Sequence, residues 1–161
     1  MKPLFTTPFK ALFLLLWLSL PAFATDYTNY CNDRFGFCVD YPSSFSMEPP
    51  PENDDGRRFH DRHGFQMTAS GINNVLDATV ASEMKSTVGD FDTVTYRKKG
   101  SNWYALSGYK GRDILYVKSY VGQSAINTLY LQYPKALKTN YDASVSRIVK
   151  SFVPGDLNEA H

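Results

Sequence analysis

The stretch RDILYVKSYV, residues 112–121, decides the class of fold. Its β-branched and aromatic residues predict a long strand, in which successive side chains point to opposite faces of a sheet. One face would carry Leu115, Val117 and Val121, and the other Ile114, Tyr116 and Tyr120. Because neither set is polar, we expect a sheet that is covered on both faces.

Short extended segments on both sides of this stretch extend the predicted sheet. From Thr93 to Tyr133 only a few residues, including glycine, separate neighbouring segments, which favours antiparallel pairing. The additional predicted strands are Phe35 to Tyr41, Phe45 to Glu48, Arg57 to His60, Phe65 to Ser70, Thr93 to Lys98, Trp103 to Ser107 and Ala125 to Tyr133.

Two amphipathic helices complete the predicted fold. The first runs from Val75 to Val88 with Asn73 or Asn74 as its N-cap, because apolar residues recur there every four positions. The second runs from Tyr141 to Phe152, after a possible helical turn over residues 135–138. Helices separated by a run of strands predict an α+β fold with a single antiparallel sheet between helices, an α/β/α sandwich.

The first 24 residues have the pattern of a secretory signal peptide. Lys2 and Lys10 precede an apolar run from Ala11 to Leu20, and Ala22-Phe23-Ala24 resembles a cleavage site. The apolar run is shorter than the ~20 residues that span a bilayer, so we expect no membrane span and a protein of the periplasm or a secreted one. We divide the chain into a signal peptide (1–24), an N-terminal segment (25–34), a single domain (35–153) and a C-terminal tail (154–161).

Composition and charge exclude several classes of protein. With 43% hydrophobic and 20% charged residues, the chain is expected to be globular rather than disordered. Loss of Lys2 and Lys10 reduces the basic residues from 17 to 15 against 16 acidic ones, a net charge of −1. A protein that binds nucleic acid normally has a stripe of basic residues, and this sequence shows none, so we expect no nucleic-acid partner.

The only two cysteines, Cys31 and Cys38, are predicted to form a structural disulfide. An exported chain with an even number of cysteines normally pairs them. Six residues separate the two, unlike a Cys-x-x-Cys redox site, and no metal-binding pattern surrounds them.

The order of elements and three motifs give the chain a family resemblance. These motifs are GFCVDYP at 36–42, DGRRF at 55–59, and Tyr133-Pro134 leading to Ser151-Phe152. From about Tyr30 to Phe152 the chain resembles the PsbP-like α/β/α sandwiches, especially small exported bacterial members, and more remotely the periplasmic DcrB-type proteins. The photosystem members are non-catalytic accessory subunits, so the resemblance implies binding rather than catalysis. It implies no site residues.

Two groups of residues are candidates for a functional site. His60, Asp61 and His63 have side chains that can ligate a transition metal, although the turn predicted there gives no assurance that they converge. Trp103, Tyr104, Tyr109, Tyr116 and Tyr120 either pack beneath helices or form an exposed face that binds a partner.

The sequence shows no catalytic motif, such as the Gly-x-Ser-x-Gly nucleophile turn, and implies no cofactor. We therefore expect a non-catalytic exported binding or accessory protein of the bacterial envelope, whose partner is a protein or glycan. The alternatives are a periplasmic immunity or inhibitor protein against a toxin, and a metal-binding protein or metal-dependent enzyme using His60, Asp61 and His63. A carrier with a small-ligand pocket between sheet and helices is a further possibility.

Overall fold

A computed structural model describes residues 25–161, and the predicted signal peptide lies outside these described residues. The strands are β1 (Tyr27–Cys31), β2 (Cys38–Pro42), β3 (Ser46–Met47), β4 (Gly56–His60), β5 (Gln66–Asn73), β6 (Thr93–Lys99), β7 (Trp103–Lys110), β8 (Asp113–Val121) and β9 (Ala125–Pro134). The helices are α1 (Val80–Thr87) and α2 (Lys138–Ser151), with single 3-10 turns η1 (Val88–Asp90) and η2 (Lys135–Leu137).

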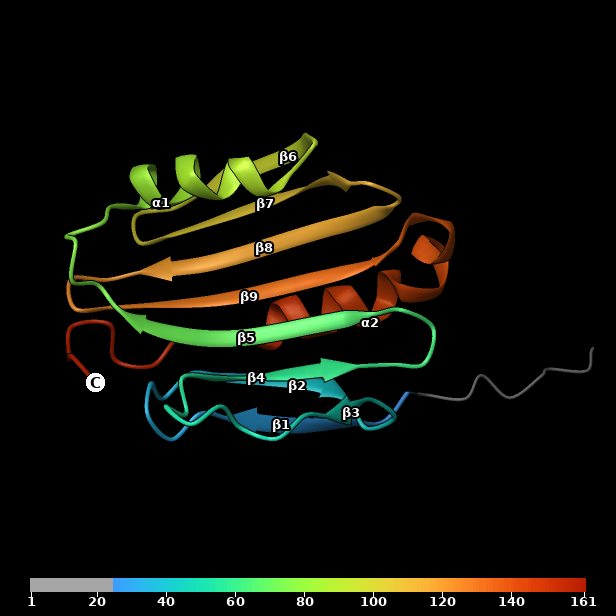
Figure 1. The fold of residues 1–161 in the computed structure, drawn as a ribbon, viewed down its shortest axis with the longest axis horizontal. Helices are drawn as coiled ribbons and strands as arrows, with labels where there is room; N and C mark the ends of the chain where they lie inside the picture. Colours follow the sequence, from blue (N-terminus) through green and yellow to red (C-terminus); the bar gives the residue numbers. More distant parts are fainter. Residues whose placement is uncertain (1–24) are drawn as a thin grey trace, which may run out of the picture.

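Seven strands form one antiparallel sheet in the order β3-β4-β5-β9-β8-β7-β6 (Figure 1). The predicted long strand is β8, which pairs with β7 over residues 113–120 and with β9 along its whole length. Leu115 and Val117 are buried in one core cluster, whereas Ile114 is buried in a second cluster. The expectation that β8 carries apolar side chains on both faces is therefore confirmed.

The two helices lie on opposite faces of the sheet and each covers only part of its face. Helix α1 packs through Val80 and Met84, and the following turn η1 through Val88, against the cluster over β7 and β8. Helix α2 packs on β9 and on the β1–β2 hairpin, and Figure 1 shows it behind β9 and β5. The predicted α+β fold, with a helix on each face of the sheet, is confirmed. The helical cover is diagonal, because each helix lies over a different half of the sheet.

The segment 25–34, expected to precede the domain, contributes strand β1, which pairs with β2 in a separate two-stranded sheet. Its sequence, YTNYC, carries no period-two apolar pattern, so the sequence did not predict this strand. Cys31 lies directly opposite Cys38 in this pairing, and the predicted disulfide is confirmed.

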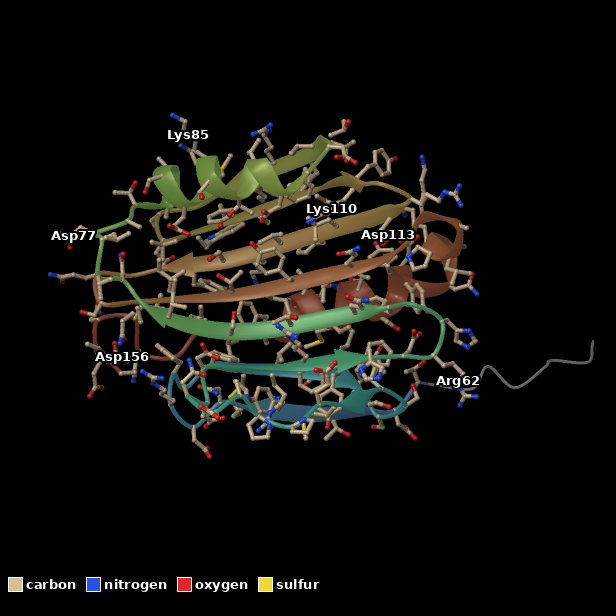
Figure 2. All side chains as sticks on the ribbon, in the orientation of Figure 1. Arg62, Asp77, Lys85, Lys110, Asp113 and Asp156 are labelled. Atoms are coloured by element: carbon tan, nitrogen blue, oxygen red, sulfur yellow. A yellow bond between two sulfur atoms is a disulfide. The ribbon has the colours of Figure 1, made fainter. Side chains whose placement is uncertain are left out.

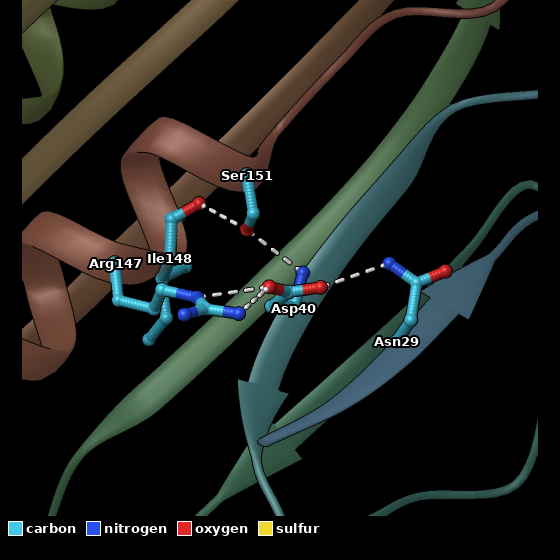
Figure 3. Close-up of polar contacts among 5 residues, drawn as sticks. All are labelled: Asn29, Asp40, Arg147, Ile148 and Ser151. Carbon is cyan, nitrogen blue, oxygen red and sulfur yellow. Dashed lines mark hydrogen bonds and ion pairs between the residues drawn. The ribbon is translucent and has the colours of Figure 1, made fainter.

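A network around Asp40 ties the β1–β2 hairpin to α2 (Figure 3). The Asp40 carboxylate accepts hydrogen bonds from Asn29 Nδ2 at 3.0 Å and from Arg147 Nε and Nη2 at 3.0 and 2.9 Å. Its backbone N–H donates to Ser151 Oγ at 2.8 Å, and that hydroxyl donates to the carbonyl of Ile148. The hydrogen bond from Asn29, together with Arg147, holds the pKa of Asp40 below its usual value.

The first helix begins at Val80 rather than Val75, which corrects the predicted start and cap. Thr79 is the N-cap: its Oγ1 accepts from the backbone N–H of Ser82, whose Oγ accepts from the N–H of Thr79. Asn74 is buried and instead donates to the carbonyls of Ala78 and Gly122. The sequence pattern predicted an earlier start because Leu76 continues the four-residue apolar period beyond the cap, although in the structure Leu76 is 86% exposed.

Strand β2 begins at Cys38 rather than Phe35 because a turn occupies residues 32–36. Gly36 has a φ of 68°, a conformation that favours glycine, and its N–H donates to the carbonyl of Asn32. The side chain of Asn32 accepts from the N–H of Phe35 at 2.7 Å. The turn places Phe35 and Phe37 in the core beneath α2 and β5.

Residues 154–161, expected to form a tail, pack against the domain. Leu157 is buried, and its carbonyl accepts from the N–H groups of Ser124 and Ala125. The carbonyl oxygen of His161 accepts from Arg34 Nη2 at 3.0 Å and from Asn73 Nδ2 at 2.6 Å. This segment therefore adds to the core on the α2 side.

Asp61 ties the β4–β5 turn to α2. Its Oδ1 accepts from the backbone N–H groups of His63 and Phe65, both at 2.8 Å, and its Oδ2 accepts from the hydroxyl of Tyr141. Partial burial alone would raise the pKa of Asp61, but these three hydrogen bonds outweigh it and hold that pKa below its usual value.

Replacing Cys31 and Cys38 together with serine should lower the free energy of unfolding by about 2.5 kcal/mol, because the bridge restricts a short loop of the unfolded chain. Urea denaturation followed by tryptophan fluorescence measures the change. The reduced wild-type protein serves as control and should share the denaturation midpoint of the double variant. An unchanged midpoint in both would contradict a stabilising disulfide.

Acid should destabilise the wild-type protein more than Asp61→Asn. Because the pKa of Asp61 is lower in the native protein than its value of 3.8 in the unfolded chain, the ionised carboxylate stabilises the fold at any pH above 3.8. This stabilisation is lost as the pH falls through the native pKa. Thermal unfolding midpoints near neutral pH and at about pH 3 measure the difference. Tyr141→Phe, which removes one donor, should give an intermediate acid dependence; equal acid dependence in wild type and Asp61→Asn would refute the assignment.

Candidate functional site

The half of the sheet that α2 leaves uncovered carries a group of aromatic side chains, which we call the aromatic face. It is formed on β6, β7 and β8 by Tyr96, Trp103, Tyr109, Tyr116 and Tyr120. Cross-strand pairing places them on one side, with Trp103 opposite Tyr120 and with Tyr96 and Tyr116 flanking Ser107. All five rings are at least partly exposed, and Tyr96 is 46% exposed. The structure thus brings together four of the five aromatic residues that the sequence singled out.

Tyr104, the fifth, points to the opposite face of the sheet. It is 1% exposed, lies beneath α1, and its hydroxyl is 2.6 Å from the Thr87 hydroxyl. Burial raises the pKa of Tyr104, so this hydroxyl is neutral. Adjacent residues of a strand alternate between faces, so Tyr104 is a core residue with no ring surface for a partner.

Lysine side chains lie over three of the exposed rings. The Nζ of Lys135 is 4.2 Å from the ring centroid of Tyr109, that of Lys118 is 4.9 Å from Tyr120, and that of Lys98 is 6.0 Å from Trp103. These are cation–π contacts, which leave the ammonium hydrogens available to other groups.

The aromatic face carries no strand residue of negative charge. The positions on β6, β7 and β8 that point to this side are Thr93, Tyr96, Lys98, Trp103, Ala105, Ser107, Tyr109, Ile114, Tyr116, Lys118 and Tyr120. The face therefore combines aromatic surface with positive charge, and it is complementary to a partner that presents carboxylates or other acceptors.

One side of the aromatic face is fixed by α2. Lys118 Nζ donates to the carbonyls of Val149 and Phe152 at 3.2 and 3.4 Å, where the negative end of the helix favours a cation. The Tyr120 hydroxyl donates to the same Phe152 carbonyl. Burial raises the pKa of Tyr116 to about 12, with neighbouring tyrosines adding to the effect, so its hydroxyl stays a donor at physiological pH.

The opposite half-face, left open by α1, is polar. Adjoining concavities of about 450, 570 and 310 Å³ over β4, β5 and β9 share Arg58 and Thr68 in their walls. Gln66 lines two of them, as does Glu48, and Gln132 donates to Asp113 at 2.7 Å at the margin. These hollows lie on the outer surface of the sheet, not between sheet and helices as the carrier hypothesis required.

The three candidate metal ligands do not converge. His60 lies on the polar half-face, where its Nδ1 is 3.5 Å from Glu48 Oε1, whereas Asp61 turns towards α2 and bonds to Tyr141. His63 is exposed in the turn. Among residues 25–161 no three His, Cys, Asp or Glu side chains are arranged to hold a metal ion. The consecutive residues His60 and Asp61 serve opposite sides of the sheet, which the sequence motif did not reveal.

No helix within the described part of the chain is long and apolar enough to cross a membrane.

Comparison with known proteins supports the fold. No protein-family model and no curated protein matches this sequence. Among solved structures, the chain is similar to the solution structure of cyanobacterial PsbP (CyanoP) from Synechocystis sp. PCC 6803, with a TM-score of 0.54 and 12% identity over 86% of this chain and 98% of that one. At this level of identity the likeness concerns the fold alone, and the chain has the PsbP-like fold that its motifs indicated.

Proposed function

We propose that this protein is a non-catalytic, exported accessory protein of the bacterial envelope that binds a protein partner on its aromatic face. The observation that carries the proposal is the grouping of Trp103, Tyr109, Tyr116 and Tyr120 with Tyr96 on a half-sheet that neither helix of the described residues covers. Partly exposed tyrosine and tryptophan side chains are the residues that most often dominate binding energy at protein interfaces.

Charge supports a protein partner rather than a neutral glycan. Lys98 and Lys135 are exposed, and neither forms an ion pair within residues 25–161. Such cations at the margin of an aromatic surface speed and orient the approach of an acidic partner. The disulfide and the signal-peptide pattern support export.

The other hypotheses fit less well. Separation of His60 from Asp61 gives the metal-dependent alternative no clustered ligand set among the described residues. An immunity or inhibitor protein would use the same surface, and the identity of the captured partner distinguishes it from a general accessory protein.

The variant Lys98→Glu with Lys135→Glu should reduce partner capture about tenfold, because it reverses two charges at the margin of the aromatic face. Both side chains are exposed, so the fold should be retained, as circular dichroism will show. The measurement is the yield of crosslinked partner in intact cells, from a photoreactive group placed at Thr93, also exposed on that side.

The matched control is Arg58→Glu with Arg62→Glu, which makes the same change of charge at exposed positions away from the aromatic face. It should leave the crosslinked yield unchanged. An equal loss in both variants would mean that net charge alone governs capture, and an unchanged yield in the first would refute the proposal. A crosslinked species that survives protease digestion would identify a glycan and overturn the assignment to a protein.

A further inference from the structure

Strand β6 forms one edge of the seven-stranded sheet and pairs on one side only, with β7. Six of its seven residues are exposed. The backbone N–H and C=O groups that point away from β7, those of every second residue, are therefore not paired with any strand among residues 25–161. An edge of this kind is a template for another strand.

A groove of about 300 Å³ runs between this edge and α1. Ala81, Met84 and Val88 of the helix and turn form its apolar part, and Lys85, Arg97 and Lys99 form its cationic rim. Figure 2 shows Lys85 at the outer edge of α1. None of the three cations forms an ion pair within the described residues.

The cations of β6 are divided between its two sides. Arg97 pairs across the strands with Leu106 and Lys99 with Tyr104, so both point to the α1 side, where the groove lies. Lys98 pairs with Ala105 and points to the aromatic face. A strand added along β6 would therefore meet positive charge on both of its sides, and a groove for apolar side chains on one.

Lysines on an edge strand also prevent uncontrolled pairing of edges. This effect acts against a second copy of the same chain, because two paired β6 strands would together carry six cations and no carboxylate. It does not act against an acidic strand, for which the same charges are attractive. The apolar groove, which the flexible side chain of Met84 lines, is not needed for this protection and suits a side chain from a partner.

We infer that the β6 edge binds an extended, acidic segment of a partner protein, which adds as a further antiparallel or parallel strand and inserts apolar side chains between β6 and α1. Main-chain hydrogen bonds supply affinity in this mode of recognition, and the pockets for alternate side chains supply specificity. The inference rests on the proposed function in one respect only, that the partner is a protein.

The test uses a synthetic seven-residue peptide of glutamate and valine, ordered so that each face of the extended strand carries both residue types. Fluorescence anisotropy measures its affinity, and amide chemical shifts locate it on the protein. Saturable binding with the largest shifts in β6 and in Met84 and Val88 is expected. Two control peptides follow: one with lysine in place of glutamate, and one N-methylated along one edge, which keeps the charge but prevents strand pairing.

Both control peptides should bind at least about tenfold more weakly than the glutamate peptide. On the protein side, Arg97→Glu with Lys99→Glu should weaken binding of the glutamate peptide by a similar factor, whereas Arg58→Glu with Arg62→Glu should not. Equal affinity for the N-methylated peptide, shifts centred away from β6, or no binding would each overturn the inference. So would a β6-dependent dimer of this chain in sedimentation measurements.

This assay needs no natural partner, so its failure is distinguishable from failure of the proposed function. If the peptide does not bind while Lys98→Glu with Lys135→Glu still reduces crosslinking in cells, the aromatic face binds a partner and the inference about the edge is wrong. If the peptide binds β6 and crosslinking is insensitive to the aromatic-face variant, the edge is a binding site and the proposed use of the aromatic face is wrong.

Discussion

The fold depends on the burial of apolar side chains on both faces of strand β8. Leu115 and Val117 enter the cluster under α1, while Ile114 enters the cluster under α2. A strand buried on both sides must lie inside a sheet and have cover on each face, which here requires two helices from distant parts of the chain. Each large buried aliphatic side chain contributes about 1.5–3 kcal/mol, so this arrangement outweighs any local preference of the connecting loops.

The length and attachment of each helix determine which surfaces stay open. Helix α1 has eight residues and packs mainly on β7 and β8. Helix α2 is held over the other half of the sheet because Asp40 and Ser151 connect it to the β1–β2 hairpin. The resulting diagonal cover leaves two half-faces of different chemistry: the aromatic face beside α2, and a polar one with Arg58 beside α1.

The core strands, the fold class and the disulfide could be predicted from the sequence. The alternation of side chains in β8 and the spacing of Cys31 and Cys38 can both be read directly from the order of residues. The start of α1 could not be predicted, because Leu76 continues the apolar period while Thr79 provides the better cap. The candidate site was half predictable. Composition singled out Trp103 and Tyr104 together, but their alternation and the position of α1 expose the first and bury the second.

Strand β6 borders both the aromatic face and the groove beside α1. Its Lys98 belongs to the aromatic face, whereas Arg97 and Lys99 border the groove beside α1. The exposed cations Arg97, Lys98 and Lys99 do not stabilise the core, because they are not buried in it. Each of these side chains also loses rotamer freedom if it becomes ordered. Ordering them against the carboxylates of a partner offsets that loss, and the free backbone groups of β6 fix the direction in which the partner lies. The same short helix that leaves this edge open therefore also sets the groove that would distinguish one acidic strand from another.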